Sequence, residues 1–281
     1  MKNLFSFLFY AFSILSFGQV IQFEKTLSQA FTKAKQQNKP VFIEYYSPSC
    51  PVCKKVAVVL KDPKVVDYYN KNFINYALNI DNGMTKEEEN FMKASGLHLD
   101  GVPVFLFFDA NKNYLHHSSV KADANTIMEI ARISLQPNLR NAALAEKYQK
   151  GDRSIKTLYA YANLLLAYQD FKKQKEVADA LYEVFPKSDL STQKSYIVLK
   201  DVVISIENGF FLHWIRNLND LKGLETGTKA GTEKDVLERI LLKELSKPER
   251  KSWPKPKKDA VKKMIVDLGL TNNPEVYFES K

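Results

Sequence analysis

The sequence predicts an α/β domain in the first half of the chain and an all-α region in the second half. Up to residue 137, short apolar runs of strand type alternate with segments whose apolar residues recur at helical spacing. This alternation is typical of a sheet covered by helices. Residues 138–246 show helical spacing without a convincing strand pattern. Hydrophobic residues make up 45% of the 281 residues, which is enough for a core in each of two domains.

The first predicted helix and strand lead into the only two cysteines of the chain. Residues 23–38 place apolar side chains on one helical face, and residues 40–46 (PVFIEYY) form a short apolar strand. The cysteine motif follows at once and contains Pro51. Proline suits the first turn of a helix, where its missing N–H group is no loss. Helices are therefore expected over 51–60 and again over 62–69.

The remaining elements of the first half complete the sheet. Thr85 and Glu88 form a capping box at the start of a helix expected over 85–95. Residues 110–113 form a turn between the last two strands, which predicts a hairpin at one edge of the sheet. These later strands are expected over 73–80, 104–108 and 114–118, and the last helix over 122–135.

The second half begins with a predicted α-hairpin, formed by helices over 158–168 and 175–185. Its layout resembles a tetratricopeptide unit, with small Ala162 in the first helix, Asp170-Phe171 in the turn and Pro186 at the end. Such a unit needs stacked neighbours to bury a core. Further helical patterns over 190–207, 210–221 and 233–245 can supply them.

A basic segment follows the predicted helices. Residues 247–263 contain eight basic and two acidic residues, and their three prolines argue against a continuous helix there. The predicted organisation is a signal peptide over 1–18, an α/β domain over 19–137, a helical domain over 138–246 and a basic, proline-containing segment over 247–281.

The first residues have the three-part layout of a secretory signal peptide. A short basic start precedes an uncharged apolar run over 4–17, and small residues flank Phe17. The run is short for a transmembrane helix. The sequence therefore predicts an exported protein, periplasmic or secreted; an uncleaved N-terminal membrane anchor is the alternative.

The chain is basic, with 41 Lys and Arg residues against 32 Asp and Glu residues. Because an exported protein rarely meets nucleic acid, we do not expect nucleic acid as a partner. The positive charge of the C-terminal segment is expected to face an anionic envelope surface or acidic partners. A purely solubilising role is the alternative.

The two cysteines are poorly suited to a structural role. A disulfide between such close neighbours closes a tiny loop and contributes little stability. A structural zinc site needs about four ligands, and the four histidines show no matching spacing; His116 and His117 are expected to be strand residues that face solvent. We therefore predict no metal and no other cofactor, and redox chemistry at the cysteines remains.

Three features around the cysteines resemble the thioredoxin superfamily. The motif CPVC (50–53) follows a strand, the sequence LNID occupies 78–81, and the sequence Gly-Val-Pro at 101–103 precedes a later strand. The resemblance covers 22–136. It implies a thioredoxin-like fold and thiol–disulfide oxidoreductase activity.

The helix that begins at the cysteine motif gives the two thiols different expected roles. A helix N-terminus presents free N–H groups and the positive end of the helix dipole, so a thiolate there is stabilised. Cys50 is therefore expected to be the exposed nucleophile, and Cys53 the resolving thiol that forms the redox disulfide with it. Pro51 and Val52 are expected to contact the substrate. A non-catalytic structural disulfide is the alternative.

The resemblance assigns three further residues. Pro103 matches the family's cis-proline, and the main chain of Val102 is expected to pair with the substrate chain; an ordinary proline at a strand start is the alternative. Glu44 matches the family's buried acid. A desolvated carboxyl there has a raised pKa and can shuttle the proton of Cys53. An exposed strand residue is the alternative for Glu44.

The sequence also departs from the family pattern. Ser49 replaces the tryptophan that precedes the first cysteine, and Ala77 replaces a lysine often found near the buried acid. No histidine lies between the cysteines, so thiolate stabilisation is expected to be weaker than in strong oxidants. These differences affect the expected redox potential rather than the reaction type.

The predicted function is that of an exported thiol–disulfide oxidoreductase, acting as a reductase or isomerase rather than as an oxidant. Its predicted partners are protein disulfide substrates and an unidentified electron donor. The helical domain is expected to select the protein partner. The alternative is a non-catalytic protein-binding module in which the thioredoxin-like fold is a scaffold.

Overall fold

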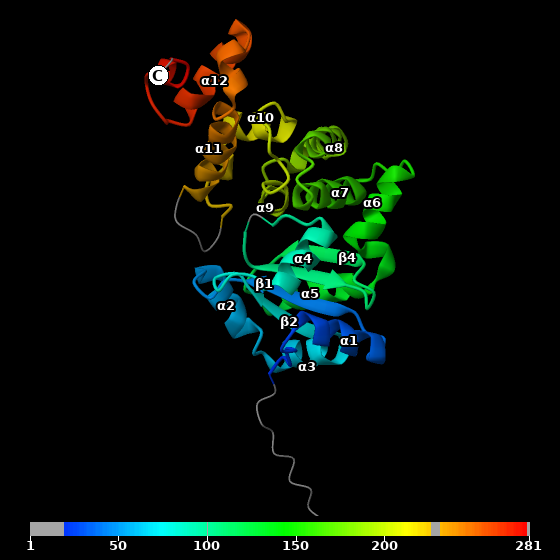
Figure 1. The fold of residues 1–281 in the computed structure, drawn as a ribbon. Helices are drawn as coiled ribbons and strands as arrows, with labels where there is room; N and C mark the ends of the chain where they lie inside the picture. The colour runs from blue at the N-terminus through cyan, green and yellow to red at the C-terminus, as the bar shows by residue number, and fades with distance from the viewer. Residues whose placement is uncertain (1–19, 100, 226–230, 280–281) are drawn as a thin grey trace, which may run out of the picture. The chain divides into compact units, whose positions relative to one another are not determined.

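The computed structural model describes residues 20–99, 101–225 and 231–279, so the predicted signal peptide over 1–18 lies outside the described residues. Two compact units make up the chain (Figure 1). The α/β unit comprises the described residues of Met1–Glu89 together with Gly101–Leu135, and the helical unit comprises those of Asn90–Asp100 and Gln136–Lys281. No helix in these described ranges is long and apolar enough to cross a membrane.

The α/β unit is built on one four-stranded sheet. Its strands are β1 (Val41–Tyr46), β2 (Ile74–Asn79), β3 (Val104–Phe108) and β4 (Tyr114–Ser119), and its helices are α1 (Leu27–Gln37), α2 (Pro51–Val59), α3 (Pro63–Asn72), α4 (Lys86–Ser95, which continues into the helical unit) and α5 (Ala124–Leu135). The strand order is β2-β1-β3-β4. β1 runs parallel to β2 and antiparallel to β3, and β3 and β4 form the predicted edge hairpin. The α/β prediction is thereby confirmed.

Both faces of the central strands are buried. On one face, Phe42 and Phe105 pack against residues of α2, α3 and α5, and the Phe42 ring lies 4.7 Å from the ring of Tyr69 on α3. On the other face, Phe31 of α1 meets Phe108 edge-on at a centroid distance of 6.5 Å. Strands covered on both sides carry few polar residues, which explains why β1 and β3 form nearly continuous apolar runs.

Short polar signals set the starts of two helices. The N–H group of Thr85 donates to Glu88 Oε2 at 2.6 Å, and the N–H group of Glu88 donates to Thr85 Oγ1 at 3.3 Å. These bonds confirm the predicted capping box of α4. At α3, the Asp62 carboxylate accepts the N–H group of Lys64 at 2.8 Å, directly before the first turn.

The strand β4 corrects the expected position of the two neighbouring histidines. His116 and His117 are only 7% and 6% exposed, although both were expected to face solvent. The Tyr114 hydroxyl lies 2.6 Å from His117 Nδ1, and burial lowers the pKa of His117 to about 4. Successive strand residues point to opposite faces, so β4 is covered on both sides, which a sequence pattern at a sheet edge does not reveal.

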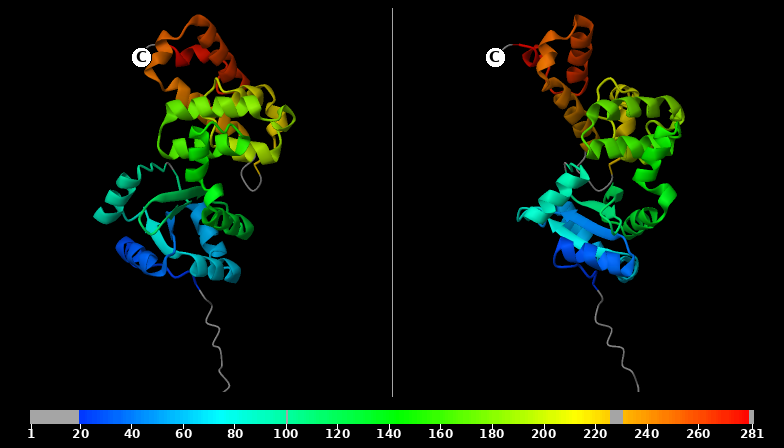
Figure 2. Two further views of the ribbon diagram at one scale, coloured as in Figure 1. Left: turned by 90° about the vertical axis from the view of Figure 1, so that its right-hand side faces the viewer. Right: turned by 45° about the vertical axis from the view of Figure 1, so that its right-hand side comes forward.

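The helical unit begins with three helices that lie side by side, α6 (Asn141–Gln149), α7 (Ile155–Ala167) and α8 (Phe171–Val184) (Figure 2). α7 and α8 confirm the predicted α-hairpin; its likeness to a tetratricopeptide unit stays a prediction. The other elements are α9 (Gln193–Leu199), α10 (Gly209–Arg216), α11 (Thr232–Leu245), α12 (Lys255–Asp267) and the short 3₁₀ turns η1 (Pro137–Leu139), η2 (Lys187–Asp189), η3 (Leu218–Leu221), η4 (Pro248–Ser252) and η5 (Pro274–Tyr277).

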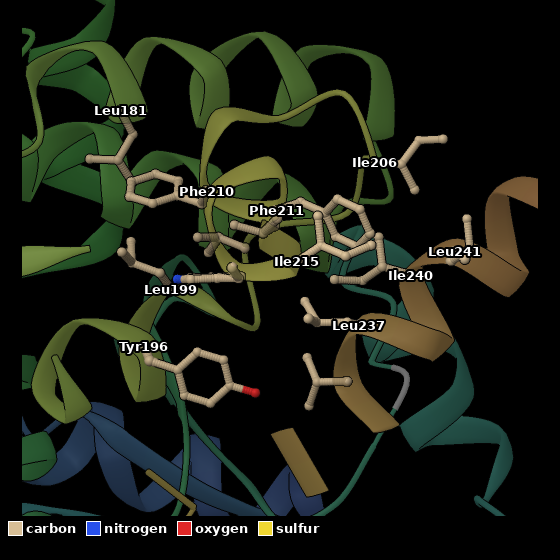
Figure 3. Close-up of a cluster of buried hydrophobic side chains, with 14 of the residues drawn as sticks. Leu181, Tyr196, Leu199, Ile206, Phe210, Phe211, Ile215, Leu237, Ile240 and Leu241 are labelled. Carbon is tan, nitrogen blue, oxygen red and sulfur yellow. The ribbon is translucent and has the colours of Figure 1, made fainter. Parts of the chain in front are cut away.

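A hydrophobic core joins the helices of this unit (Figure 3). Phe210, Phe211 and Ile215 of α10 lie between the labelled side chains of α9 and those of α11. Trp214 of the same helix is completely buried, and its indole N–H group donates to the Leu190 carbonyl at 2.8 Å. α10 is thus the central element of this core.

The C-terminal segment belongs to the helical unit and does not stand apart from residue 247 onward. Pro254 is the N-cap residue of α12, and Pro256 lies in its first turn, where the missing N–H group is no loss. Val261 and Ile265 of α12 are part of the core. As predicted, residues 247–263 do not form one continuous helix, because η4 ends at Ser252 and α12 begins only at Lys255. The sequence did not predict α12 itself, whose prolines mark its start.

Two segments add detail to the predicted organisation. Residues 90–100 group by contacts with the helical unit, where the N–H group of His98 donates to the carbonyl of Ala167 at 2.6 Å, and the predicted domain bounds stay a prediction. Such a contact joins distant parts of the chain, so local patterns do not show it. The helix expected over 190–207 is also shorter, because α9 ends at Leu199.

Candidate active site

The two cysteines lie at the start of α2, shortly after the central strand β1. β1 ends at Tyr46, and the loop over 47–49 leads to Cys50, the N-cap residue of α2. Pro51 occupies the first helical position. The Sγ atom of Cys50 accepts a hydrogen bond from the N–H group of Cys53 at 3.4 Å. The first thiol therefore satisfies one of the helix's free donors, as a capping side chain does.

The two thiols differ in burial and in pKa. Cys50 is half-buried, Cys53 is only 2% exposed, and both are free thiols. Partial burial acts to raise the pKa of Cys50, but hydrogen bonds from the N–H group and thiol of Cys53 and from the N–H group of Val52 outweigh it and lower that pKa. Burial raises the pKa of Cys53 to about 11. Cys50 is therefore the more readily ionised thiol.

Glu44 lies in β1 on the face of the sheet that α2, α3 and α5 cover. It follows Phe42 by two residues, so the two side chains share this face. The residue is 6% exposed, and burial raises the pKa of its carboxyl to about 7. Its charge contributes to the raised pKa of Cys53. The structure thus excludes the exposed alternative for Glu44, while its role as a proton shuttle stays a prediction.

The segment before β3 lies beside the first cysteine. The Val102–Pro103 peptide bond is cis, as the resemblance implies. The thiol of Cys50 donates to the main-chain oxygen of Val102, with Sγ and O separated by 3.7 Å. Pro51 is exposed and Val52 is 45% exposed. The structure therefore brings Pro51, Val52 and the half-buried Val102 close to Cys50, while Pro103 is buried; the substrate contacts themselves stay a prediction.

Asp81, the last residue of the LNID sequence, is a carboxylate next to the cysteine loop to which sequence reasoning assigned no role. Asp81 Oδ2 accepts the N–H group of Ser49 at 2.9 Å, and the Ser47 hydroxyl also donates to this carboxylate. β1 and β2 are parallel neighbours, so their carboxyl ends lie at the same edge of the sheet. An aspartate soon after β2 is therefore a signal that could have placed Asp81 beside the residues that follow β1.

One comparison with known protein families identifies the α/β unit. A family model described as a thioredoxin-like domain matches residues 27–123. These residues form a thioredoxin-like domain. The matched range contains both cysteines, Glu44 and Pro103, and it confirms the resemblance seen in the sequence. The helices from α6 onward lie outside this thioredoxin-like domain.

Comparisons with individual proteins add two similar solved structures. A solution structure of a "putative disulphide-isomerase" from Bacteroides thetaiotaomicron is 23% identical, with 42% of this chain and 96% of that chain covered and a TM-score of 0.36. A solution structure of a thioredoxin from Thermus thermophilus is 18% identical, with 41% and 85% covered and a TM-score of 0.30. No curated protein matches the chain significantly.

Proposed function

We propose that this protein is an exported thiol–disulfide oxidoreductase whose thioredoxin-like domain acts on protein disulfides. The proposal is carried by the pair of unlike thiols at the start of α2. Cys50 is half-buried with a lowered pKa, and Cys53 is buried with a pKa of about 11. One thiol is suited to attack a disulfide, and the other can act only after its proton has been removed.

The first step is attack by the Cys50 thiolate on one sulfur of the substrate disulfide. A new S–S bond forms between Cys50 and that sulfur while the substrate's own S–S bond breaks. The second substrate sulfur leaves as a thiolate and takes up a proton from solvent. The main chain of Val102 is the proposed partner of the substrate chain during this attack, which the 3.7 Å separation between its oxygen and Cys50 Sγ supports.

The second step is release of the substrate by Cys53. Its thiol must lose a proton before it attacks Cys50 Sγ, and the carboxylate of Glu44, with a pKa of about 7, is the proposed acceptor of that proton. A bond forms between the two cysteines, and the bond between Cys50 and the substrate breaks. The products are a reduced substrate and a Cys50–Cys53 disulfide.

Reduction or isomerisation fits the site better than oxidation. A strong oxidant depends on a highly stabilised thiolate. Here the charge of Asp81 opposes ionisation of Cys50, and the motif contains no histidine. As a reductase the chain needs a dithiol donor that reduces the Cys50–Cys53 disulfide. As an isomerase it consumes no donor, because another thiol of the same substrate attacks the mixed disulfide.

Export and partner selection complete the proposal. The signal-peptide pattern over 1–18 supports a periplasmic or secreted location. The thiol chemistry resides in the thioredoxin-like domain, which leaves the helical unit available for choosing a protein partner. The basic residues over 247–263 support contact with an anionic envelope surface.

Reduction of insulin by dithiothreitol tests the enzymatic part of the proposal. The wild-type chain should accelerate the reaction, and Cys50→Ser should abolish the acceleration because the attacking sulfur is gone. If the folded wild-type chain gives no acceleration, the better reading is the non-catalytic protein-binding module, with the thioredoxin-like fold as its scaffold.

A further inference from the structure

A polar network holds the loop between β1 and α2, and the thiol chemistry described above does not use it. The N–H group of Cys50 donates to both the carbonyl and the Oγ atom of Ser47, each at 3.2 Å. The Oγ atoms of Ser47 and Ser49 are 2.8 Å apart. Ser47, which accepts the hydrogen bond from the Cys50 N–H group, is only 4% exposed and therefore lies in the protein interior.

Asp81 joins this network to the neighbouring strand. Its carboxylate accepts the N–H group of Ser49 and the hydroxyl of Ser47. Its own N–H group donates to Oδ1 of Asn79, the last residue of β2, at 3.0 Å. The N–H group of Ile80, the residue between Asn79 and Asp81, donates to the carbonyl of Tyr46 at 3.0 Å. Asp81 thus lies in an exposed turn directly after β2, and these hydrogen bonds connect that turn to the ends of β1 and β2.

We propose that Asp81 is a positioning residue that ties the loop before α2 to the end of β2 and thereby fixes Cys50 at the start of the helix. The tie runs through the Ser49 N–H group and the Ser47 hydroxyl. The inference deepens the proposed function and rests on it, because Cys50 is the attacking thiol there. It assigns a role in that reaction to a residue that touches neither the substrate nor a reacting sulfur.

The position and the charge of Asp81 have opposite effects on Cys50. Hydrogen bonds from the Ser47 hydroxyl and the Ser49 N–H group lower the pKa of Asp81, so it is a carboxylate at neutral pH. Its negative charge acts to raise the pKa of Cys50. Within the described residues, the other carboxyl that acts on a thiol is Glu44 on β1, which raises the pKa of Cys53, and Tyr46 lies near Glu44 and Asp81. Asp81 therefore aligns Cys50 with the helix donors and also limits its ionisation.

Two substitutions separate these effects. Asp81→Asn keeps an oxygen that can accept the Ser49 N–H group but removes the charge, whereas Asp81→Ala removes both. Asp123→Asn is the matched control, because Asp123 is an exposed carboxylate of the same unit that accepts the N–H group and hydroxyl of Thr126 at 2.7 and 2.9 Å. Asp123 is not among the groups that shift the pKa of either thiol.

The measurement is the rate of Cys50 alkylation by iodoacetamide in the reduced full chain, followed against pH, with the modified cysteine located by mass spectrometry. Asp81→Asn should lower the pKa of Cys50 and raise the rate below that pKa on the order of threefold, as expected for the loss of one solvent-exposed charge a few ångströms away. Asp81→Ala should react more slowly than Asp81→Asn, because the loop has lost its tie. Asp123→Asn should match the wild type.

Two results would overturn the inference. If the alkylation rate of Cys50 depends on pH in the same way in Asp81→Asn and in the wild type, the charge of Asp81 has no role. If it depends on pH in the same way in Asp81→Ala and Asp81→Asn, Asp81 has no positioning role. If Asp81→Ala does not fold in a urea titration, Ser47→Ala replaces it. Ser47→Ala removes the hydroxyl that donates to Asp81 but keeps the Asp81 carboxylate, so the pKa of Cys50 should rise. An unchanged pKa of Cys50 would contradict the positioning role of Asp81. Alkylation needs no substrate turnover, so this outcome and the insulin result are independent.

Discussion

At the scale of single residues, Glu44 occupies a position where its ionised form is unfavourable. It is 6% exposed in the middle of the central strand, and burial raises the pKa of its carboxyl to about 7. Near neutral pH both the acid and the carboxylate are therefore populated. This is the condition for a group that accepts a proton from Cys53 and later returns it to solvent.

Replacement of Glu44 by glutamine should slow release of the substrate and leave attack unchanged. Glutamine keeps the shape of the side chain but cannot accept the Cys53 proton, so release should fall on the order of a hundredfold. Stopped-flow kinetics with a model disulfide resolve the two steps. Glu129→Gln, which alters an exposed carboxylate on α5, should change neither step. Equal rates in Glu44→Gln and the wild type would remove Glu44 from the mechanism.

The same substitution should also change how stability depends on pH. The carboxyl of Glu44 has an ordinary pKa of 4.5 and a pKa of about 7 in the folded chain. As pH rises between these values, the unfolded chain loses the proton while the folded chain keeps it, so this group's contribution to stability is full at low pH and lost above about pH 7. The free energy of unfolding of Glu44→Gln, relative to the wild type, should therefore rise by up to about 3 kcal/mol from about pH 4 to about pH 8.

Urea titrations of the two reduced chains measure this difference directly. Other titrating groups are common to both chains and cancel in the comparison. A difference that stays constant across the pH range would contradict the raised pKa of Glu44 and, with it, the ability of this carboxyl to take up a proton near neutral pH.

The residues of the candidate site were not equally accessible to sequence reasoning. Cys50 and Cys53 form a recognisable motif, and Glu44 interrupts an apolar strand, so each leaves a local signal. Asp81 contacts the loop only because two parallel strands end at the same edge of the sheet. Its contact with Ser49 spans 32 residues of sequence, so the motif LNID that contains Asp81 shows its role only when combined with the strand arrangement.

At the scale of the secondary-structure element, the first turn of α2 separates the two thiols by one helical turn. Cys50 precedes the helix and Cys53 lies inside its first turn, on the buried side. The helix therefore exposes one sulfur to a substrate and keeps the other beneath it. The positions of the two thiols on α2 predict which cysteine remains attached to the substrate when the other cysteine is replaced.

Cys53→Ser should accumulate mixed disulfides through Cys50, because attack remains and release is lost. Expressed with residues 1–18 in place, the variant should show adducts on non-reducing gels that disappear with dithiothreitol, and mass spectrometry should identify the attached proteins. Cys50→Ser should show far fewer adducts. If Cys50→Ser traps partners and Cys53→Ser does not, the two roles are reversed.

The elements themselves differed in how well the sequence predicted them. The four strands agree with their expected bounds to within one residue at either end, because β1, β2 and β3 carry apolar runs and the turn over 110–113 predicts β4 as a hairpin partner. α12 was missed because its prolines suggested a break, although two of them stand at a helix start. α9 is shorter than its apolar pattern, since buried residues beyond Leu199, including Val202 and Val203, pack from a turn.

At the scale of the whole molecule, the charge of the basic segment is partly neutralised within the helical unit. Lys247 and Lys257 both pair with Glu244, which is nearly buried. Lys262 and Lys263 also pair with carboxylates, those of Glu275 and Asp267. The remaining basic side chains have no carboxylate partner within the described residues. They are Arg250, Lys251, Lys255 and Lys258, located around the break between η4 and α12.

This unpaired group narrows the proposed contact with an anionic surface to four residues. Each lysine near such a surface contributes about 1 kcal/mol. Replacing Lys251, Lys255 and Lys258 by glutamate should therefore weaken binding to vesicles that contain anionic lipid by at least on the order of a hundredfold. The wild-type affinity should also fall as salt is added, because exposed charges are screened beyond about 8–10 Å near physiological ionic strength.

The matched control places the same change of charge elsewhere on the helical unit. Lys156, Lys172 and Lys194 are exposed lysines on α7, α8 and α9, and their replacement by glutamate gives a chain of identical net charge. Vesicle co-sedimentation at several salt concentrations compares the two triple variants with the wild type. If both variants lose affinity equally, the chain responds to net charge alone. If the variant with glutamate at positions 251, 255 and 258 binds the vesicles as tightly as the wild type, these residues do not form the membrane-binding surface. Three negative charges there should repel anionic lipid.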